Sequence, residues 1–282
     1  MPTRTVKGRQ IKKIHFISGL PRSGSTLLAA ILRQNPRFHA GMTSPVGELI
    51  SALILEMSCK NDTSVFISED QRESILRSVI YGYYNSFDKN INVIFDTGRV
   101  WCSKMPLLAT LFSSSKIIVC VRELPWIMDS IERVIRTQPL SANKMFGFNA
   151  VETVYSRVEM LIDTRGLLGF AYQATKDAWY GSYAQDRMVV ITYEGLTKDP
   201  EKAMRALYRF IDEPYFKHDF DHVQYSADEF DARLGVPGLH TVKPQVFAPK
   251  RESVLPPDLF KRFVNDAFWL DPKNNIHHVP VI

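Results

Sequence analysis

Short apolar runs rich in β-branched residues alternate along this chain with segments in which apolar residues recur at helical spacing. Such runs are typical of strands buried on both faces of a parallel sheet. They lie at residues 14–18, 91–96, 116–121 and 187–193. Strands that alternate with helices form right-handed crossovers. The pattern therefore predicts an α/β fold with a central, mainly parallel sheet flanked by helices.

Residues 212–258 interrupt this alternation, because they are rich in Asp, His, Gly and Pro and show little periodicity. Long loops of this kind often close over a ligand in α/β proteins. A basic N-terminal segment covers residues 1–13, and longer mixed helical segments are predicted at 46–58, 68–86 and 150–180. At about 150 residues per domain, 282 residues allow one or two domains. No internal repeat divides the chain, so we predict a single domain over residues 1–282.

The segment Gly-Leu-Pro-Arg-Ser-Gly-Ser-Thr at 19–26 joins the first predicted strand to the first predicted helix. Its frame is that of a phosphate loop in which Ser25 replaces the usual Lys. Backbone N–H groups and the positive end of a helix dipole favour an anion at such a turn. Hydroxyls add donors, and a guanidinium suits bidentate phosphate contact. The candidate phosphate-binding residues are Arg22, Ser23, Gly24, Ser25 and Thr26.

The missing Lys bears on the type of nucleotide. In NTP-hydrolysing enzymes that Lys reaches the β- and γ-phosphates, and an Asp after a second strand helps to hold Mg²⁺. Asp96 ends the run at 91–96 and could act as that Asp. A magnesium-dependent nucleotide kinase or NTPase therefore remains one alternative. A non-catalytic nucleotide-binding protein is another.

The loop GLPRSGSTLL closely resembles the 5′-phosphosulfate loop of sulfotransferases that use 3′-phosphoadenosine 5′-phosphosulfate (PAPS). The nearest pattern is that of the tyrosylprotein sulfotransferases and their soluble bacterial relatives. A second family signature is a strand that ends in Arg, with a Ser eight residues later, as in Arg122 and Ser130. The resemblance implies a phosphate-loop-like sulfotransferase architecture in which this pair binds the 3′-phosphate. It also implies in-line sulfonate transfer without a metal, leaving adenosine 3′,5′-bisphosphate (PAP) as product.

Three further segments match the family pattern in the same order along the chain. Ser103-Lys104-Met105-Pro106 resembles the segment whose Lys contacts the transferring sulfonate, which makes Lys104 a catalytic candidate beside Arg22. Tyr193, after the last predicted strand, matches a Tyr that lies near the adenine. Lys243, in a Val-Lys-Pro segment, matches a Lys of the loop that closes over the nucleotide.

The general base is less clear from the sequence. In the tyrosylprotein enzymes a Glu follows shortly after the first helix, and Thr43 occupies that position here. The nearest carboxylate is Glu48, which opens a predicted helix beside the loop, and His39 is the alternative base. The sequence leaves open which of the two acts, or whether neither does.

Charge and composition narrow the partners. A net charge of +5 is too small to indicate nucleic acid but suits a protein that handles small anions. The family's peptide-gripping Arg has no equivalent, so we expect a small-molecule or glycan acceptor, sulfonated on oxygen or nitrogen. Three widely spaced Cys without a CxxC pair, and no apolar stretch near 20 residues, predict a cytoplasmic protein with no membrane span. Whether it forms a homodimer is left open.

Overall fold

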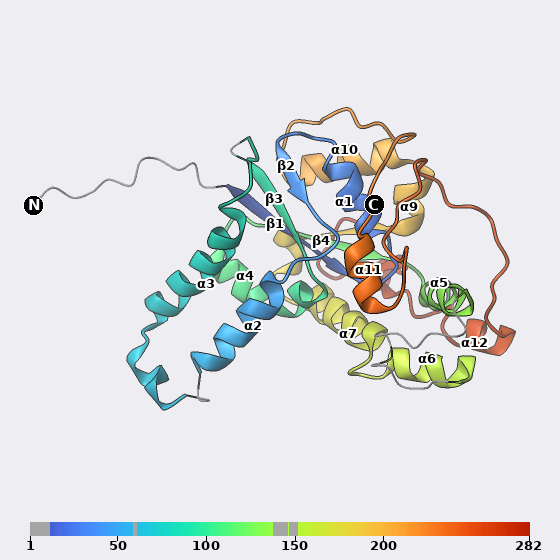
Figure 1. The fold of residues 1–282 in the computed structure, drawn as a ribbon, viewed down its shortest axis with the longest axis horizontal. Helices are drawn as coiled ribbons and strands as arrows, with labels where there is room; N and C mark the ends of the chain where they lie inside the picture. The colour runs from blue at the N-terminus through green and yellow to red at the C-terminus, as the bar shows by residue number, and fades with distance from the viewer. Residues whose placement is uncertain (1–11, 59–60, 89, 138–145, 147–151) are drawn as a thin grey trace, which may run out of the picture.

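Five parallel strands form the centre of the molecule (Figure 1). The computed structural model describes residues 12–58, 61–88, 90–137, 146 and 152–282. Its sheet has the order β2-β3-β1-β4-β5. The strands are β1 (Lys13–Gly19), β2 (Phe38–Ala40), β3 (Val93–Thr97), β4 (Ile117–Val121) and β5 (Met188–Thr192). The predicted α/β class is confirmed. The three-residue strand β2 was not predicted, because it is too short for its own periodicity.

Alternate residues of each strand enter two separate cores. Ile118 and Cys120 of β4 face one core, whereas Ile117, Val119 and Val121 face the other. The first core is covered by α1 (Ser25–Leu32) and α10 (Pro200–Phe210). Burial of both faces explains why the strands read as continuous apolar runs.

The second core is larger and is covered by helices from the middle of the chain. They are α2 (Val46–Glu56), α3 (Glu69–Tyr84), α4 (Met105–Leu111), α5 (Leu124–Arg136), α6 (Val154–Ile162) and α7 (Leu167–Tyr180). The segment predicted as one mixed helical stretch at 150–180 is thus two helices. Figure 1 shows α2 and α3 projecting from the sheet as an arm.

The remaining helices are short. They are α8 (Ala184–Arg187), α9 (Tyr193–Lys198), α11 (Asp228–Leu234) and α12 (Pro257–Arg262). Short 3₁₀ helices are η1 (Asp62–Phe66), η2 (Arg99–Lys104), η4 (Phe268–Leu270) and η5 (Pro272–Asn274). Helix α11 lies within 212–258, so the expectation of loops alone was wrong there.

The structure also bears on the predictions about membrane spans and cysteines. None of the helices in the described ranges has the length and apolar character that a membrane crossing requires. Cys102 and Cys120 are free and buried, and burial raises the pKa of their thiols to about 11 and about 12. Cys59 lies outside the described residues.

Asp96 joins three segments beneath the sheet edge. Its fully buried carboxylate accepts hydrogen bonds from Tyr84 Oη (2.6 Å), Ser44 Oγ (2.7 Å) and Trp101 Nε1 (2.7 Å). These donors come from α3, the loop before α2, and η2. Burial raises the pKa of the Asp96 carboxyl, and the three donors oppose that shift. One side chain therefore anchors the arm and the Lys104 segment to β3.

We expect Asp96→Ala to lower the free energy of unfolding by about 2–4 kcal/mol, because two buried donors and the partly buried Ser44 hydroxyl lose their acceptor together. Urea unfolding followed by circular dichroism measures the loss. The matched control, Asp177→Ala, changes an exposed residue of α7 and should stay within about 0.5 kcal/mol of the wild type. A loss below about 1 kcal/mol for Asp96→Ala would contradict the anchoring role.

Candidate functional site

The predicted site residues gather where the parallel strands end. The phosphate loop follows β1, Lys104 ends η2 after β3, Arg122 follows β4 and Tyr193 follows β5. Because all the strands are parallel, their carboxyl ends share one edge of the sheet. Ligands of open α/β sheets bind at this edge.

The phosphate loop requires glycine at both of its turns. Gly19 has φ 111°, and a Cβ there would lie 2.2 Å from the carbonyl oxygen of Cys120. Gly24, with φ 94°, lies against the ring of Tyr193. The Ser23 hydroxyl is buried within 2.5 Å of Leu20 O and 2.9 Å of Cys120 O, so it holds the loop in place. Any contact of Ser23 with an anion therefore comes from its backbone.

Ser25 and Thr26 occupy the first turn of α1, directly after Gly24. Within the described residues, neither hydroxyl has a hydrogen-bond partner, and both side chains are partly exposed. The first N–H groups of a helix also lack partners inside it. The start of α1 thus presents free donors and the positive end of a helix dipole.

Arg22 links three distant segments. Its Nε donates to Ser130 Oγ of α5 at 3.2 Å, and its Nη1 donates to Leu239 O at 2.5 Å. Arg22 adopts φ 57°, an uncommon conformation for a side-chain-bearing residue. Its pKa is lowered by burial and by the neighbouring charge of Arg122. The loop, α5 and the segment after α11 therefore meet at one guanidinium.

Arg122 stacks on Tyr193 and is incompletely paired. The guanidinium carbon lies 4.1 Å from the centre of the Tyr193 ring. Its Nε is buried without a hydrogen-bond partner, since the carboxylate of Glu194 is 3.7 Å away. Burial is the main cause that lowers the pKa of Arg122. A buried donor without a partner is costly and indicates an acceptor that belongs there when the site is filled.

Arg251 is a third guanidinium of this cluster, and no sequence motif pointed to it. Its positive charge lowers the pKa of both Arg22 and Arg122, which places it near both. Its Nη2 lies 2.6 Å from Asp129 Oδ2, a fully buried carboxylate of α5. Three guanidiniums gathered beside one acidic helix are an arrangement that suits the binding of an anion.

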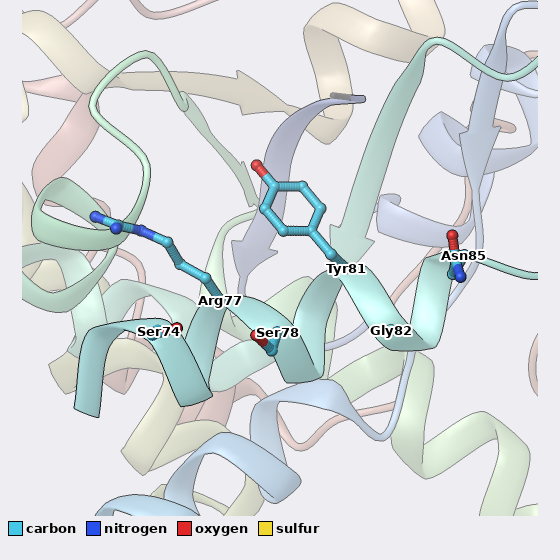
Figure 2. Close-up of a pocket in the computed structure, with 6 residues that line it drawn as sticks. All are labelled: Ser74, Arg77, Ser78, Tyr81, Gly82 and Asn85. Carbon is cyan, nitrogen blue, oxygen red and sulfur yellow. The ribbon is translucent and has the colours of Figure 1, made fainter. Parts of the chain in front are cut away.

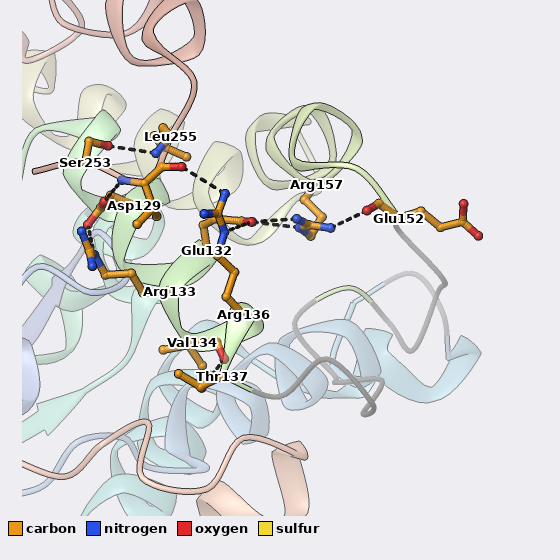
Figure 3. Close-up of polar contacts among 11 residues, drawn as sticks. Asp129, Glu132, Arg133, Val134, Arg136, Thr137, Glu152, Arg157, Ser253 and Leu255 are labelled. Carbon is orange, nitrogen blue, oxygen red and sulfur yellow. Dashed lines mark hydrogen bonds and ion pairs between the residues drawn. The ribbon is translucent and has the colours of Figure 1, made fainter.

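The same helix holds the segment that carries Arg251 (Figure 3). Asp129 Oδ1 accepts from the backbone N–H of Val254 at 2.8 Å, and Arg136 Nη2 donates to Val254 O at 3.1 Å. Glu132 is paired with Arg136 at 2.9 Å and with Arg157 of α6 at 2.8 Å. Two buried carboxylates of α5 thus fix the position of residues 251–255 beside the phosphate loop.

Lys104 reaches the same edge through η2. The Ser18 hydroxyl of β1 donates to Arg99 O at 3.1 Å and accepts from Cys102 N–H at 3.2 Å, which ties η2 to β1. Lys104 is partly buried, forms no ion pair with any described residue, and has a pKa lowered by desolvation. A partly desolvated ammonium without an ion pair, on an element bonded to the strand that precedes the phosphate loop, is suited to a substrate anion.

The two predicted bases occupy different surroundings. Glu48 is exposed in the first turn of α2. Burial lowers the pKa of Arg99 and the negative charge of Glu48 opposes that shift, so the two residues are neighbours. The His39 ring packs against Phe87 and Tyr84, with ring centres 4.2 and 5.6 Å apart. Burial lowers the pKa of His39 to about 4. His39 is therefore neutral and set among aromatic rings rather than with the loop residues.

Lys243 is the predicted nucleotide residue with the least support. Its side chain is exposed, and none of the described contacts links it to Arg22, Arg122 or Ser130. Arg251 takes the place near those residues instead. Arg251, eight positions after Lys243, lies near them because the chain has turned back onto α5 by that point.

The structure also bears on metal binding. Asp96, the candidate magnesium ligand, is fully buried and already accepts three hydrogen bonds, so it faces the protein interior. Among the described residues, no group of three His, Cys, Asp or Glu side chains is placed to hold a metal ion.

Two surface hollows lie on the arm, away from these residues. One of about 420 Å³ follows a single face of α3 and is lined by Ser74, Arg77, Ser78, Tyr81, Gly82 and Asn85 (Figure 2). The other, of about 970 Å³, lies between α2, α3 and α4. Neither contains a predicted site residue.

Residues 15–217 match the model of the sulfotransferase family, and the chain belongs to that family. Among curated proteins it resembles the zebrafish (Danio rerio) protein-tyrosine sulfotransferase 1, with 23% identity over 205 residues. This match covers 71% of the chain but 53% of the relative, so the chain spans about half the relative's length.

Solved structures that resemble this one include three sulfotransferases. The domain from the curacin biosynthetic pathway shares 19% identity and covers 74% of this chain and 76% of its own, with a TM-score of 0.46. The domain from the Synechococcus PCC 7002 olefin synthase shares 17% identity, and the match covers 96% of this chain and 99% of that domain, with a TM-score of 0.48. Mouse sulfotransferase SULT7A1, complexed with PAP, shares 16% identity, and the match covers 94% of this chain and 80% of the mouse chain, with a TM-score of 0.47.

We expect inorganic phosphate to raise the melting temperature of the wild type more than that of Arg122→Gln. Loss of a charge-assisted contact of about 1.5–3 kcal/mol weakens an anion's binding by roughly ten- to a hundred-fold. Differential scanning fluorimetry across a phosphate titration measures the difference. Arg209→Gln, which changes an exposed residue of α10, controls for general salt effects. Equal responses of Arg122→Gln and the wild type would contradict an anion site at Arg122.

Proposed function

We propose that this protein transfers a sulfonate group from PAPS to a hydroxyl or amine of a small-molecule or glycan acceptor. The observation that carries the proposal is the buried Nε of Arg122, which forms no hydrogen bond, within a cluster of three guanidiniums. This cluster adjoins a phosphate loop in a chain of the sulfotransferase family. Membership supports the reaction class, and the cluster supports a nucleotide with an additional phosphate beyond the one at the loop.

Each group of residues has a role in this proposal. The start of α1, with Ser25 and Thr26, holds the 5′-phosphosulfate together with the Gly24 backbone. Arg122 and Ser130 hold the 3′-phosphate, Arg22 lies between the two anionic groups, and Tyr193 lies beside the adenine. Arg251 joins the 3′-phosphate group, and Lys243 remains a predicted contact of the closing loop.

When bound, PAPS supplies the sulfonate and a leaving group that accumulates negative charge. In this proposal Lys104, at the end of η2, neutralises that charge, and its partial desolvation strengthens its interaction with an anion. No metal takes part in this scheme. A magnesium-dependent kinase has less support, because the hydrogen bonds to Asp96 are those of a structural carboxylate.

We also propose that residues 1–282 act as one domain in which residues 212–258 cover the nucleotide. The contact of Leu239 with Arg22 and that of Arg251 with Asp129 support this arrangement, because both join the segment to the loop and α5. The cytoplasm remains the proposed compartment on the cysteine pattern, and a homodimer remains open.

We expect PAP to raise the melting temperature by roughly 5–10 °C at 100 times its dissociation constant, which corresponds to about 2.7 kcal/mol. ATP with Mg²⁺ should give a much smaller shift, because the site has no phosphate-loop Lys. Thermal shift assays with both ligands make the comparison. A shift with ATP and Mg²⁺ alone would refute the sulfotransferase proposal in favour of a kinase or NTPase.

We expect Lys104→Met to lower the rate of PAP release from PAPS by roughly 10²–10³-fold, because a preorganised charge is lost from the transition state. PAP affinity should stay within a few-fold, since the Lys acts on the transferring group. The assay uses a panel of phenols, alcohols, amines and sugars, with chromatographic detection of PAP. Lys202→Met, at an exposed position of α10, is the control. An undiminished rate for Lys104→Met would remove Lys104 from the mechanism.

A further inference from the structure

A histidine and an aspartate outside every sequence motif form a tight pair beside the phosphate loop. His240 Nδ1 lies 2.5 Å from Asp231 Oδ1, and the backbone N–H of His240 donates to Asp231 Oδ2 at 2.8 Å. Asp231 is fully buried in the first turn of α11, whereas the His240 side chain keeps 19% of its surface exposed. Both carboxylate oxygens of Asp231 thus hold His240, and these two contacts determine the orientation of the imidazole ring.

The pair lies near the phosphate loop that the proposed function uses. Leu239, directly before His240, accepts the hydrogen bond from Arg22 of the phosphate loop. The charges of Arg22 and Arg99 both act on the imidazole of His240. Arg99 begins η2, the element that ends in Lys104. The ring is therefore near the two elements that flank the transferring group in the proposal.

The hydrogen bonds determine which nitrogen is free. A carboxylate that accepts from Nδ1–H leaves Nε2 as the unprotonated nitrogen of a neutral imidazole. No described residue contacts His240 Nε2 by a hydrogen bond, and the side chain is partly open to solvent. Burial, Arg22 and Arg99 lower the pKa of His240, and Asp231 opposes them. The neutral form consequently prevails at neutral pH.

We propose that Nε2 of His240 is the general base of the sulfonate transfer, with Asp231 as its positioning residue. In this step the acceptor's O–H or N–H proton passes to Nε2 while the acceptor atom bonds to sulfur. The bond from sulfur to the bridging oxygen breaks, and that oxygen leaves on PAP with the electron pair. The imidazolium is stabilised by Asp231 and later returns its proton to water. This inference rests on the proposed function.

The two bases considered from the sequence are less suited to this role. Glu48 is exposed and lies beside Arg99, an arrangement that serves binding of an acceptor as readily as proton transfer. His39 packs between aromatic rings of the arm. Of these three described side chains, His240 alone combines a free nitrogen, an orienting carboxylate and a direct chain connection to a residue bonded to Arg22.

The tautomer can be measured without any acceptor. We expect ¹⁵N NMR of histidine-labelled protein at pH 7.5, with and without PAP, to show His240 protonated on Nδ1 and unprotonated on Nε2. The signal is assigned by its loss in His240→Asn. A ring protonated on Nε2 in the PAP complex would overturn the proposal, whatever the activity.

Kinetics test the base directly. We expect His240→Asn, whose amide can still donate to Asp231, to lower PAP release by roughly 10²-fold or more while PAP affinity stays within about three-fold. The rate is measured with the acceptor panel, or with water where no member accelerates release. Glu48→Gln should keep the wild-type pH profile. Wild-type activity of His240→Asn would overturn the assignment to His240. Loss of the acid limb of the pH profile in Glu48→Gln, but not in His240→Asn, would overturn it as well.

The pH profile tests Asp231. The wild-type rate should fall as pH drops through a value below 6.5, the ordinary pKa of His, because protonation removes the base. Asp231→Asn should move that limb to lower pH and reduce the rate at least about ten-fold, since the imidazolium loses its counter-charge. If the acid limb of the pH profile stayed in place in Asp231→Asn, Asp231 would have a structural role alone. Failure of the wild type to bind PAP would refute the proposed function as well, and the affinity measurement separates that result from loss of turnover alone.

Discussion

The guanidinium of Arg22 is the point on which the arrangement of this site depends. It donates to Ser130 of α5 and to Leu239 in the segment after α11, and it belongs to the loop between β1 and α1. Three parts of the chain separated by about a hundred residues each are thereby held at one edge of the sheet. The contact with Leu239 brings the neighbouring His240 and its partner Asp231 to the same edge, where β4 and α5 place Arg122 and Arg251.

The second feature of this edge of the sheet is an excess of positive charge. Burial lowers the pKa of Arg22 and of Arg122, the charge of Arg251 lowers both further, and the buried Nε of Arg122 forms no hydrogen bond. A protein that needed these arginines for stability alone would pair them fully, as Glu132 is paired with Arg136 and Arg157. The incompletely paired cluster is consistent with a site whose stability is reduced in favour of binding an anion.

Much of the fold and part of the site could be predicted from sequence. The runs that became β1, β3, β4 and β5 were recognisable because burial on both faces requires continuous apolar residues. The loop at 19–26 was recognisable because its turns require glycine at fixed positions. By contrast, β2 is only three residues long, and α11 is a single short helix in a polar segment, so neither has a detectable period.

The sequence by itself determined the parallel α/β sheet, the phosphate loop and the order of Lys104, Arg122 and Tyr193 along the chain. These features depend on local spacing, because each lies within a few residues of a strand end. Only the tertiary structure decided that Asp96 is an internal anchor, that Arg251 joins the arginine cluster, and that His240 meets Asp231 beside Arg22. Their roles depend on contacts between remote segments, which packing rather than sequence spacing establishes.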